Sequence, residues 1–334
     1  MSARAFISGC ASLRLSAEER AFFRDARPWG LILFARNCDE PEQIRRLTAE
    51  FRDAVGRGDA PVLIDQEGGR VQRLRPPHWT AWPPARAYRA LYLDDPRRGL
   101  DLVRGTARLI AGELAAVGIT VDCLPVADVP QPGAHDIIGD RAYGDSPDEV
   151  AEMARAAAEG LLDGGVLPVV KHIPGHGRAG IDSHEGLPVV EADAETLRRV
   201  DFAPFAALKD LPMAMTAHVI YTAFDPDRPA TLSPVVIGEV IRKEIGFDGL
   251  LMTDDLSMGA LDGSLRDRTE RSLAAGCDMA LHCNGRLDEM AEVAAAAPCL
   301  EGRAAERADR ALDSARTAAP VDVAAIHVEL ANLC

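Results

Sequence analysis

An aspartate and a histidine two residues apart lie in a segment that is unusually rich in histidine. Three of the chain's eight histidines, His172, His176 and His184, fall between residues 171 and 184, together with Asp182. A carboxylate that accepts a hydrogen bond from an imidazole fixes the ring tautomer and raises its basicity, so the Asp182–His184 pair suits general acid–base catalysis. Glycine and proline residues around the pair indicate a loop. Each histidine could instead only satisfy backbone groups within that loop.

Acidic residues directly follow two other apolar stretches of the sequence. Asp65 ends one short apolar run and precedes a glycine pair, which would let the backbone approach a ligand closely. Asp254 and Asp255 are adjacent at the end of another run. Because an isolated carboxylate is costly to bury, we expect one of this pair to be held for use, while the other could cap a helix. Side-chain alternation along a strand predicts that only one of them faces the site.

Three further polar residues are weaker candidates for a site. Arg141 lies well beyond an apolar run, in a loop that could reach back and clamp a polar ligand, although a surface ion pair would explain it equally well. His218 ends one apolar run and Asn284 follows another. The sequence assigns no role to His176, His218 or Asn284.

Eight short apolar runs recur along the chain, each bounded by turn or polar residues. Such runs are typical of strands that are buried on both faces of a parallel sheet. They are Ala5–Gly9, Gly30–Phe34, Val62–Asp65, Ile119–Pro125, Leu167–Lys171, Met213–His218, Leu250–Asp254 and Met279–His282.

Helical signals separate these runs. Ser16 with Glu19 has capping-box spacing, and Ser146-Pro147 begins a strong helix start. We therefore predict an α/β fold: one (β/α)8 TIM barrel over residues 1–334, with residues 302–334 as a helix and tail packed outside. An open doubly wound sheet is the alternative, but no GxGxxG follows a strand. In such a barrel the catalytic groups come from the carboxyl ends of the strands.

Charge and cysteine content restrict the classes of function. The formal net charge of −15 and the sequence pI of about 5.0 make nucleic acid an unlikely partner. The seven cysteines are odd in number and form no CxxC pair, which indicates reduced thiols. The first residues do not resemble a signal peptide, and no apolar stretch is long enough to span a membrane. We therefore expect a cytoplasmic protein with no membrane partner.

Four motifs together resemble glycoside hydrolase family 3, and within it the bacterial single-domain β-N-acetylhexosaminidases. They are Ile64–Val71, Lys171–Gly177, Asp182–His184 and Thr253–Met258. The resemblance extends from about residue 4 to about residue 290, with the motifs in order and at fitting spacing. It implies that Asp254 is the nucleophile of a retaining mechanism. It also implies that His184 is the general acid and base, with Asp182 as its partner.

The resemblance also implies how substrate is bound. Asp65, Arg73, Arg141, Lys171 and His172 would hold the sugar, with no metal and no cofactor. Ile173 replaces the phenylalanine that is more usual in this motif, and both side chains are apolar. The implied substrate is a GlcNAc-containing muropeptide, cut by a monomeric enzyme of peptidoglycan recycling.

Three competing functions are open at this point. The chain could be a phosphorylase, because a histidine acid/base avoids repulsion with incoming phosphate. His172, His176, Asp182 and His184 could instead bind a metal in a barrel hydrolase. A non-catalytic sugar-binding protein is the third possibility. For a glycosidase, we expect the Asp182–His184 loop to be mobile and to close over substrate.

Overall fold

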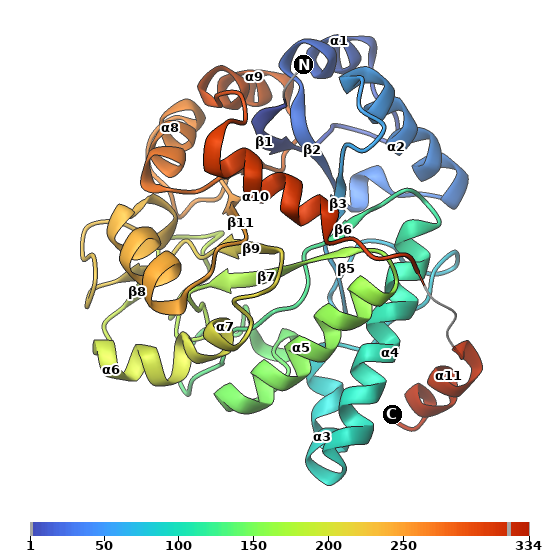
Figure 1. The fold of residues 1–334 in the computed structure, drawn as a ribbon, viewed down its shortest axis with the longest axis vertical. Helices are drawn as coiled ribbons and strands as arrows, with labels where there is room; N and C mark the ends of the chain where they lie inside the picture. Colours follow the sequence, from blue (N-terminus) through green and yellow to red (C-terminus); the bar gives the residue numbers. More distant parts are fainter. Residues whose placement is uncertain (1–2, 319–321, 334) are drawn as a thin grey trace.

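A closed parallel barrel forms the centre of the molecule. The computed structural model describes residues 3–318 and 322–333. Its eight barrel strands are hydrogen-bonded in the ring order β1-β12-β11-β9-β7-β6-β3-β2, so each strand lies beside the next barrel strand along the chain. Helices surround the ring (Figure 1). The predicted (β/α)8 barrel is confirmed.

Each predicted apolar run overlaps one barrel strand. The strands are β1 (Arg4–Ser8), β2 (Pro28–Leu33), β3 (Val62–Ile64), β6 (Val121–Asp122), β7 (Leu167–Ile173), β9 (Met213–Thr216), β11 (Leu250–Asp255) and β12 (Met279–His282). Their inward side chains fill the barrel with a tightly packed apolar core that includes Ile32, Leu63, Val169 and Met252. Short additional strands lie outside the ring: β4 (Gln66–Gly68), β5 (Val71–Gln72), β8 (Val189–Val190) and β10 (Ile220–Tyr221).

Two of the differences between the predicted and observed strand bounds bear on the site. The run at residues 119–125 forms a regular strand only at Val121–Asp122, although the carbonyl oxygens of Leu124 and Pro125 still accept N–H groups of β7. In contrast, β7 continues to Ile173. Lys171 and His172 therefore lie on a strand, where the backbone holds them more firmly than a loop would.

The outer layer consists mainly of α-helices. They are α1 (Ala17–Ala26), α2 (Pro41–Val55), α3 (Arg89–Asp94), α4 (Pro96–Ala115), α5 (Pro147–Asp163), α6 (Ala194–Thr196), α7 (Ala203–Ala207), α8 (Leu265–Ala275), α9 (Leu287–Ala296), α10 (Gly302–Asp313) and α11 (Val323–Ala331). The predicted starts are present: Ser16 and Glu19 form a capping box on α1, and the Ser146 hydroxyl accepts the Glu149 N–H at the start of α5. π-Helical stretches occupy Leu197–Asp201 and Val236–Ile245.

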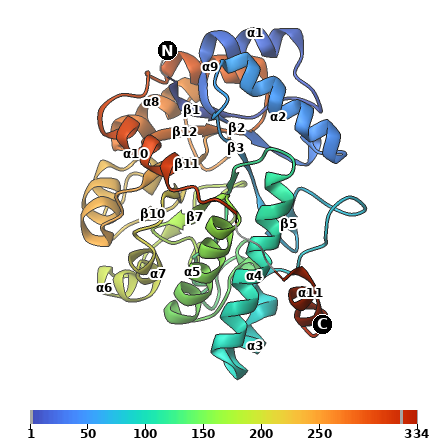
Figure 2. The ribbon, with the colours of Figure 1, turned by 45° about the vertical axis from the view of Figure 1, so that its right-hand side comes forward.

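The C-terminal segment contains more structure than a helix and a tail. After α10, the chain forms a second helix, α11, which lies against α4 in both views (Figures 1 and 2). Ile326 and Leu330 of α11 pack against the core, and Glu329 pairs with Arg98 of α4. The segment predicted as a tail therefore contributes a packed helix to the outside of the barrel.

Two further predictions concern reduced cysteine thiols and membrane-spanning segments. Six cysteines are free thiols, and the seventh, Cys334, lies outside the described residues. None of the helices in residues 3–318 and 322–333 has the length and apolar character needed to cross a bilayer.

Helices α4 and α5 pack so closely that a glycine is required between them. A Cβ atom at Gly160 of α5 would lie 2.2 Å from the Arg104 carbonyl oxygen on α4. Gly160→Ala should therefore lower the free energy of unfolding by about 1–3 kcal/mol, because overpacking outweighs the better helix propensity of alanine. Urea denaturation followed by circular dichroism measures the change. Gly112→Ala is the matched control: a Cβ there meets no atom within 4 Å, so it should stabilise slightly. A Gly160→Ala variant as stable as the control would contradict this account.

Candidate active site

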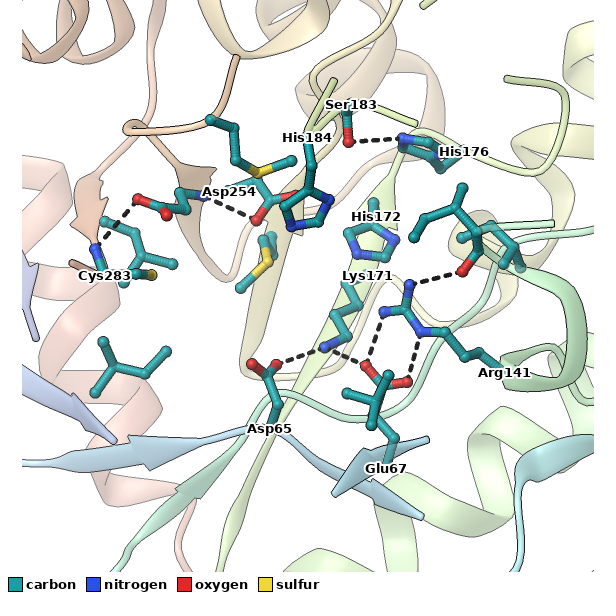
Figure 3. Close-up of a pocket in the computed structure, with 18 of the residues that line it drawn as sticks. Asp65, Glu67, Arg141, Lys171, His172, His176, Ser183, His184, Asp254 and Cys283 are labelled. Atoms are coloured by element: carbon teal, nitrogen blue, oxygen red, sulfur yellow. Dashed lines mark hydrogen bonds and ion pairs between the residues drawn. The ribbon is translucent and has the colours of Figure 1, made fainter. Parts of the chain in front are cut away.

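A cavity of about 280 Å³ opens where the barrel strands end at their carboxyl side (Figure 3). It contains seven of the eight predicted site residues: Asp65, Arg73, Arg141, Lys171, His172, His184 and Asp254. The eighth, Asp182, does not line the cavity but is hydrogen-bonded to His184. Parallel strands place all their carboxyl ends at one face, which is why residues so distant in sequence converge here.

A cluster of five charged side chains forms one side of the cavity. The Lys171 Nζ atom lies 2.8 Å from Asp65 Oδ1 and 2.6 Å from Glu67 Oε1. Arg73 donates to the other oxygen of Asp65 at 3.0 Å, and Arg141 binds both oxygens of Glu67 at 2.8 Å. Three cations thus surround two carboxylates, and the cluster presents charged donors and acceptors that can bind sugar hydroxyls.

The cluster keeps its carboxyl groups ionised. Burial alone would raise the pKa of Asp65, but Lys171 and Arg73 outweigh it and hold the pKa well below its usual range. In the same way, Arg141 and Lys171 overcome burial at Glu67 and lower its pKa to about 2. These groups stay charged and fixed, which suits binding better than proton transfer.

Glu67 is a site residue that sequence reasoning missed. It lies on β4, directly after the strand end that carries Asp65. Residues two apart on an extended chain point to the same side. The spacing of two residues between Asp65 and Glu67 could therefore have identified Glu67 from the sequence.

His172 is held by a second residue that sequence reasoning missed. Its Nδ1 atom lies 2.7 Å from a carboxylate oxygen of Asp128, which is fully buried. The other oxygen of Asp128 accepts the backbone N–H groups of His172 and His176. Because Nδ1 is paired with the carboxylate, the Nε2 atom of His172 is the ring nitrogen left for a ligand.

The predicted Asp182–His184 pair is present. His184 Nδ1 lies 2.8 Å from Asp182 Oδ1, and the same oxygen accepts the His184 backbone N–H at 2.9 Å. Burial acts to raise the pKa of Asp182, but these bonds from His184 lower it. The His184 side chain is 66% exposed, so its Nε2 atom can exchange a proton with a ligand or with water.

The two adjacent acids at the end of β11 have different environments. Asp255 uses its carboxylate to bind the N–H and hydroxyl of Ser257 and the N–H of Cys283. Among the described residues, the Asp254 carboxylate accepts only the N–H of Asp255, at 2.8 Å, and it borders the cavity. Burial opposes its ionisation, but His218, His172, the Asp255 N–H and Lys171 together lower its pKa. Asp254 is therefore an ionised carboxylate with an oxygen available for chemistry.

The three residues without a predicted role occupy different places. His218 is buried beside the nucleophile candidate, between the Thr231 hydroxyl and the Asp255 carbonyl oxygen, and does not line the cavity. Asn284 donates to Glu289 and also lies outside the lining. His176 does line the cavity, where its ring is buried against Ser183.

The histidine cluster does not form a metal-ligand set. Within the part of the chain that the structure describes, no three His, Cys, Asp or Glu side chains converge in an arrangement that could hold an ion. His172 pairs with Asp128 through Nδ1, and His184 pairs with Asp182, so three of the four proposed ligands are already engaged.

The chain is similar to enzymes of one family along most of its length. Residues 6–313 match the model of the glycosyl hydrolase family 3 N terminal domain. A β-hexosaminidase from Alkalilimnicola ehrlichii is 42% identical over 83% of this chain and 79% of its own length.

Solved structures give the same result. NagZ from Neisseria gonorrhoeae, in complex with N-trifluoroacetyl-D-glucosamine, superposes with a TM-score of 0.89 at 30% identity, covering 100% of this chain and 98% of that one. A glycoside hydrolase family 3 β-N-acetylglucosaminidase from Paenibacillus sp. str. FPU-7 superposes with a TM-score of 0.87 at 30% identity, and this chain, 98% covered, spans 66% of that longer one.

A parallel barrel, an ionised aspartate and an exposed Asp–His pair at its mouth thus occur in a chain whose relatives are named β-hexosaminidase. The protein is a glycoside hydrolase of the β-N-acetylhexosaminidase type, and the chain belongs to glycoside hydrolase family 3.

Proposed function

We propose that the enzyme removes terminal β-linked GlcNAc with retention of configuration, through a covalent glycosyl-enzyme on Asp254. One observation carries the proposal: Asp254 and His184 border the same cavity, one with an ionised carboxylate and the other with an exposed Nε2 atom. A retaining glycosidase needs a nucleophile of this kind and a group that can both give and take a proton.

In the first step, an oxygen of Asp254 attacks the anomeric carbon. The Nε2–H group of His184 donates its proton to the glycosidic oxygen as the bond to the aglycone breaks. Asp182, at 2.8 Å from Nδ1, stabilises the imidazolium before transfer and orients the ring. The aglycone leaves as an alcohol, and His184 is left neutral.

The second step reverses the proton transfer. Neutral His184 accepts a proton at Nε2 from a water molecule, whose oxygen attacks the anomeric carbon. The ester bond to Asp254 breaks and its carboxylate is restored. Histidine has an ordinary pKa of about 6.5, so an imidazole can serve in both directions near neutral pH.

The charged cluster would hold the sugar during both steps. Asp65 and Glu67 offer acceptors, and Lys171, Arg73 and Arg141 offer donors, all fixed by mutual ion pairs. Fixed partners of this kind position a substrate without reorganising as it reacts. His172 adds a polar ring nitrogen at Nε2.

The proposed natural substrate is a GlcNAc-containing anhydro-muropeptide, which places the enzyme in peptidoglycan recycling in the cytoplasm. The similarity to relatives named β-hexosaminidase supports GlcNAc as the sugar that is removed. The solved structure from Neisseria gonorrhoeae holds an N-acylated glucosamine analogue. The proposed aglycone, an anhydro-muropeptide, rests on the resemblance of the four sequence motifs to this family. A single catalytic domain and a monomeric state are part of the same proposal.

Asp254→Asn should lower turnover by on the order of 10⁴-fold or more, because an amide cannot form the glycosyl-enzyme. Release of p-nitrophenol from its β-GlcNAc derivative measures turnover, and inhibitor binding shows that the site is intact. Asp254→Ala repeats the test without an amide that could hydrolyse back. Asp262→Asn, at an exposed carboxylate, is the matched control. Wild-type activity in the Asp254 variants would refute the assignment.

His184→Ala should lower kcat/KM by about 10²–10⁴-fold on a phenyl leaving group, because such a group needs protonation to depart. On a 2,4-dinitrophenyl leaving group, which needs little protonation, the loss should be small. Steady-state kinetics on both substrates give the comparison, with the exposed His78→Ala as control. Equal losses on the two substrates would contradict the acid role.

A phosphorylase is the competing activity, because the acid/base is a histidine rather than a carboxylate that would repel phosphate. We expect free GlcNAc from p-nitrophenyl β-GlcNAc at the same rate with and without inorganic phosphate. Chromatography of the products distinguishes the outcomes. Accumulation of GlcNAc 1-phosphate would assign phosphorolysis instead. The p-nitrophenyl β-glucoside, assayed alongside, tests the sugar preference: its faster cleavage would overturn the GlcNAc specificity.

A further inference from the structure

The loop that carries Asp182 and His184 is anchored firmly at both ends. At its start, Gly177 approaches the backbone of Val129 so closely that a Cβ would lie 2.0 Å from the Val129 carbonyl oxygen, and Arg178 pairs with the buried Asp201 at 2.7 Å. At its end, β8 pairs with β10. The catalytic residues lie between these anchors.

Between the anchors, Ser183 is the one buried residue of the segment 180–187. It is 3% exposed, whereas the His184 side chain beside it is 66% exposed and Ile181 is 45% exposed. The Ser183 hydroxyl lies 3.3 Å from His176 Nε2 (Figure 3). Its carbonyl oxygen accepts the Ala260 N–H at 3.1 Å. Ser183 thus docks the loop on two sides.

The two docking partners belong to the segments that carry the rest of the site. His176 follows His172, and the Asp128 carboxylate holds the backbone N–H groups of both. Ala260 lies in the loop that follows Asp254 at the end of β11. The position of Ser183 therefore fixes the loop relative to both the sugar-binding side and the nucleophile side.

Gly259 makes the close contact on the nucleophile side possible. A Cβ atom there would lie 2.8 Å from the His184 carbonyl oxygen. Real Cβ contacts are essentially never shorter than 3.0 Å, so a larger residue would push the catalytic loop outward.

The ring of His176 has no hydrogen-bond partner other than Ser183 among the described residues. Its Nδ1 atom is buried and unpaired. A buried polar group left unpaired costs free energy, so a hydrophobic residue would serve better if the position were only structural. Burial, followed by the neighbouring His172, lowers the pKa of His176 to about 4, so the ring is neutral at physiological pH.

We propose that His176 and Ser183 are positioning residues for the acid/base, forming a latch that seats His184 against the scissile bond. This inference rests on the proposed role of the Asp182–His184 pair. The latch acts through the loop and does not itself touch reacting atoms. Its loss should reproduce, in weaker form, the kinetic signature of losing His184.

The first test is Ser183→Ala, compared with His184→Ala on the same phenyl and 2,4-dinitrophenyl substrates. Removing one hydrogen bond should lower kcat/KM on the phenyl substrate about tenfold, with little change on the activated one. Ser272→Ala, which removes a buried hydroxyl in α8, is the matched control and should leave both values unchanged. A uniform loss on both substrates would show a merely structural role and overturn the latch.

The second test addresses His176 directly. His176→Phe should give the same selective loss, and His176→Gln, which can restore a polar group near the Nε2 position, should recover part of it. In the Ser183→Ala, His176→Phe double variant, the losses should not multiply, because both remove the same contact. Independent, multiplicative losses would contradict the proposal.

A third variant leaves the hydrogen bond intact. Gly259→Ala should displace the loop from the other side and again spare the activated substrate, with Gly112→Ala as its control. The outcomes separate the two proposals. If His184→Ala itself shows no dependence on the leaving group, the acid role fails; if it does but the Ser183, His176 and Gly259 variants do not, only the latch fails.

Discussion

The buried ammonium group of Lys171 holds together the side of the site that we propose binds the sugar. Its side chain is 2% exposed and contacts both Asp65 and Glu67. A buried charge costs several kcal/mol unless it is paired, and removing one partner leaves the other uncompensated. Each carboxylate here also pairs with an arginine, so neither carboxylate depends on Lys171 alone. The cluster joins β7 to the segment after β3, and it also fixes Arg141, which comes from the loop after β6.

Two Asp–His pairs in the same site have opposite surroundings. The Asp128–His172 pair is buried, and Asp128 also fixes two backbone N–H groups. The Asp182–His184 pair has the same Nδ1 geometry, but its ring is exposed. A buried, immobile ring suits recognition, whereas an exposed ring on a loop can exchange protons with both aglycone and water. The difference lies in the environment of each pair and not in its chemistry.

The sequence predicted the barrel because strands buried on both faces appear as short apolar runs. It predicted Asp65 and Asp254 because a parallel barrel brings strand-end acids to one face. Asp128 had no such signal: it lies in irregular backbone beyond a two-residue strand, and its role depends on contacts with a residue 44 positions away. The burial of Ser183 between exposed neighbours likewise depends on His176 and Ala260, which no local pattern reveals.

In the proposed mechanism, the loop that carries His184 has to satisfy two opposing requirements. Substrate must enter a cavity that His184 borders, yet proton transfer needs His184 within hydrogen-bond reach of one oxygen. Rigid anchors at the loop ends, such as the Arg178–Asp201 pair, limit where the middle can go. If the loop opens as we expect, a single small docking residue, with a hydrogen bond worth about 1 kcal/mol, would release and reseat without disturbing those anchors. Because the docking partners follow the strands that bear His172 and Asp254, the loop can return to one position relative to both.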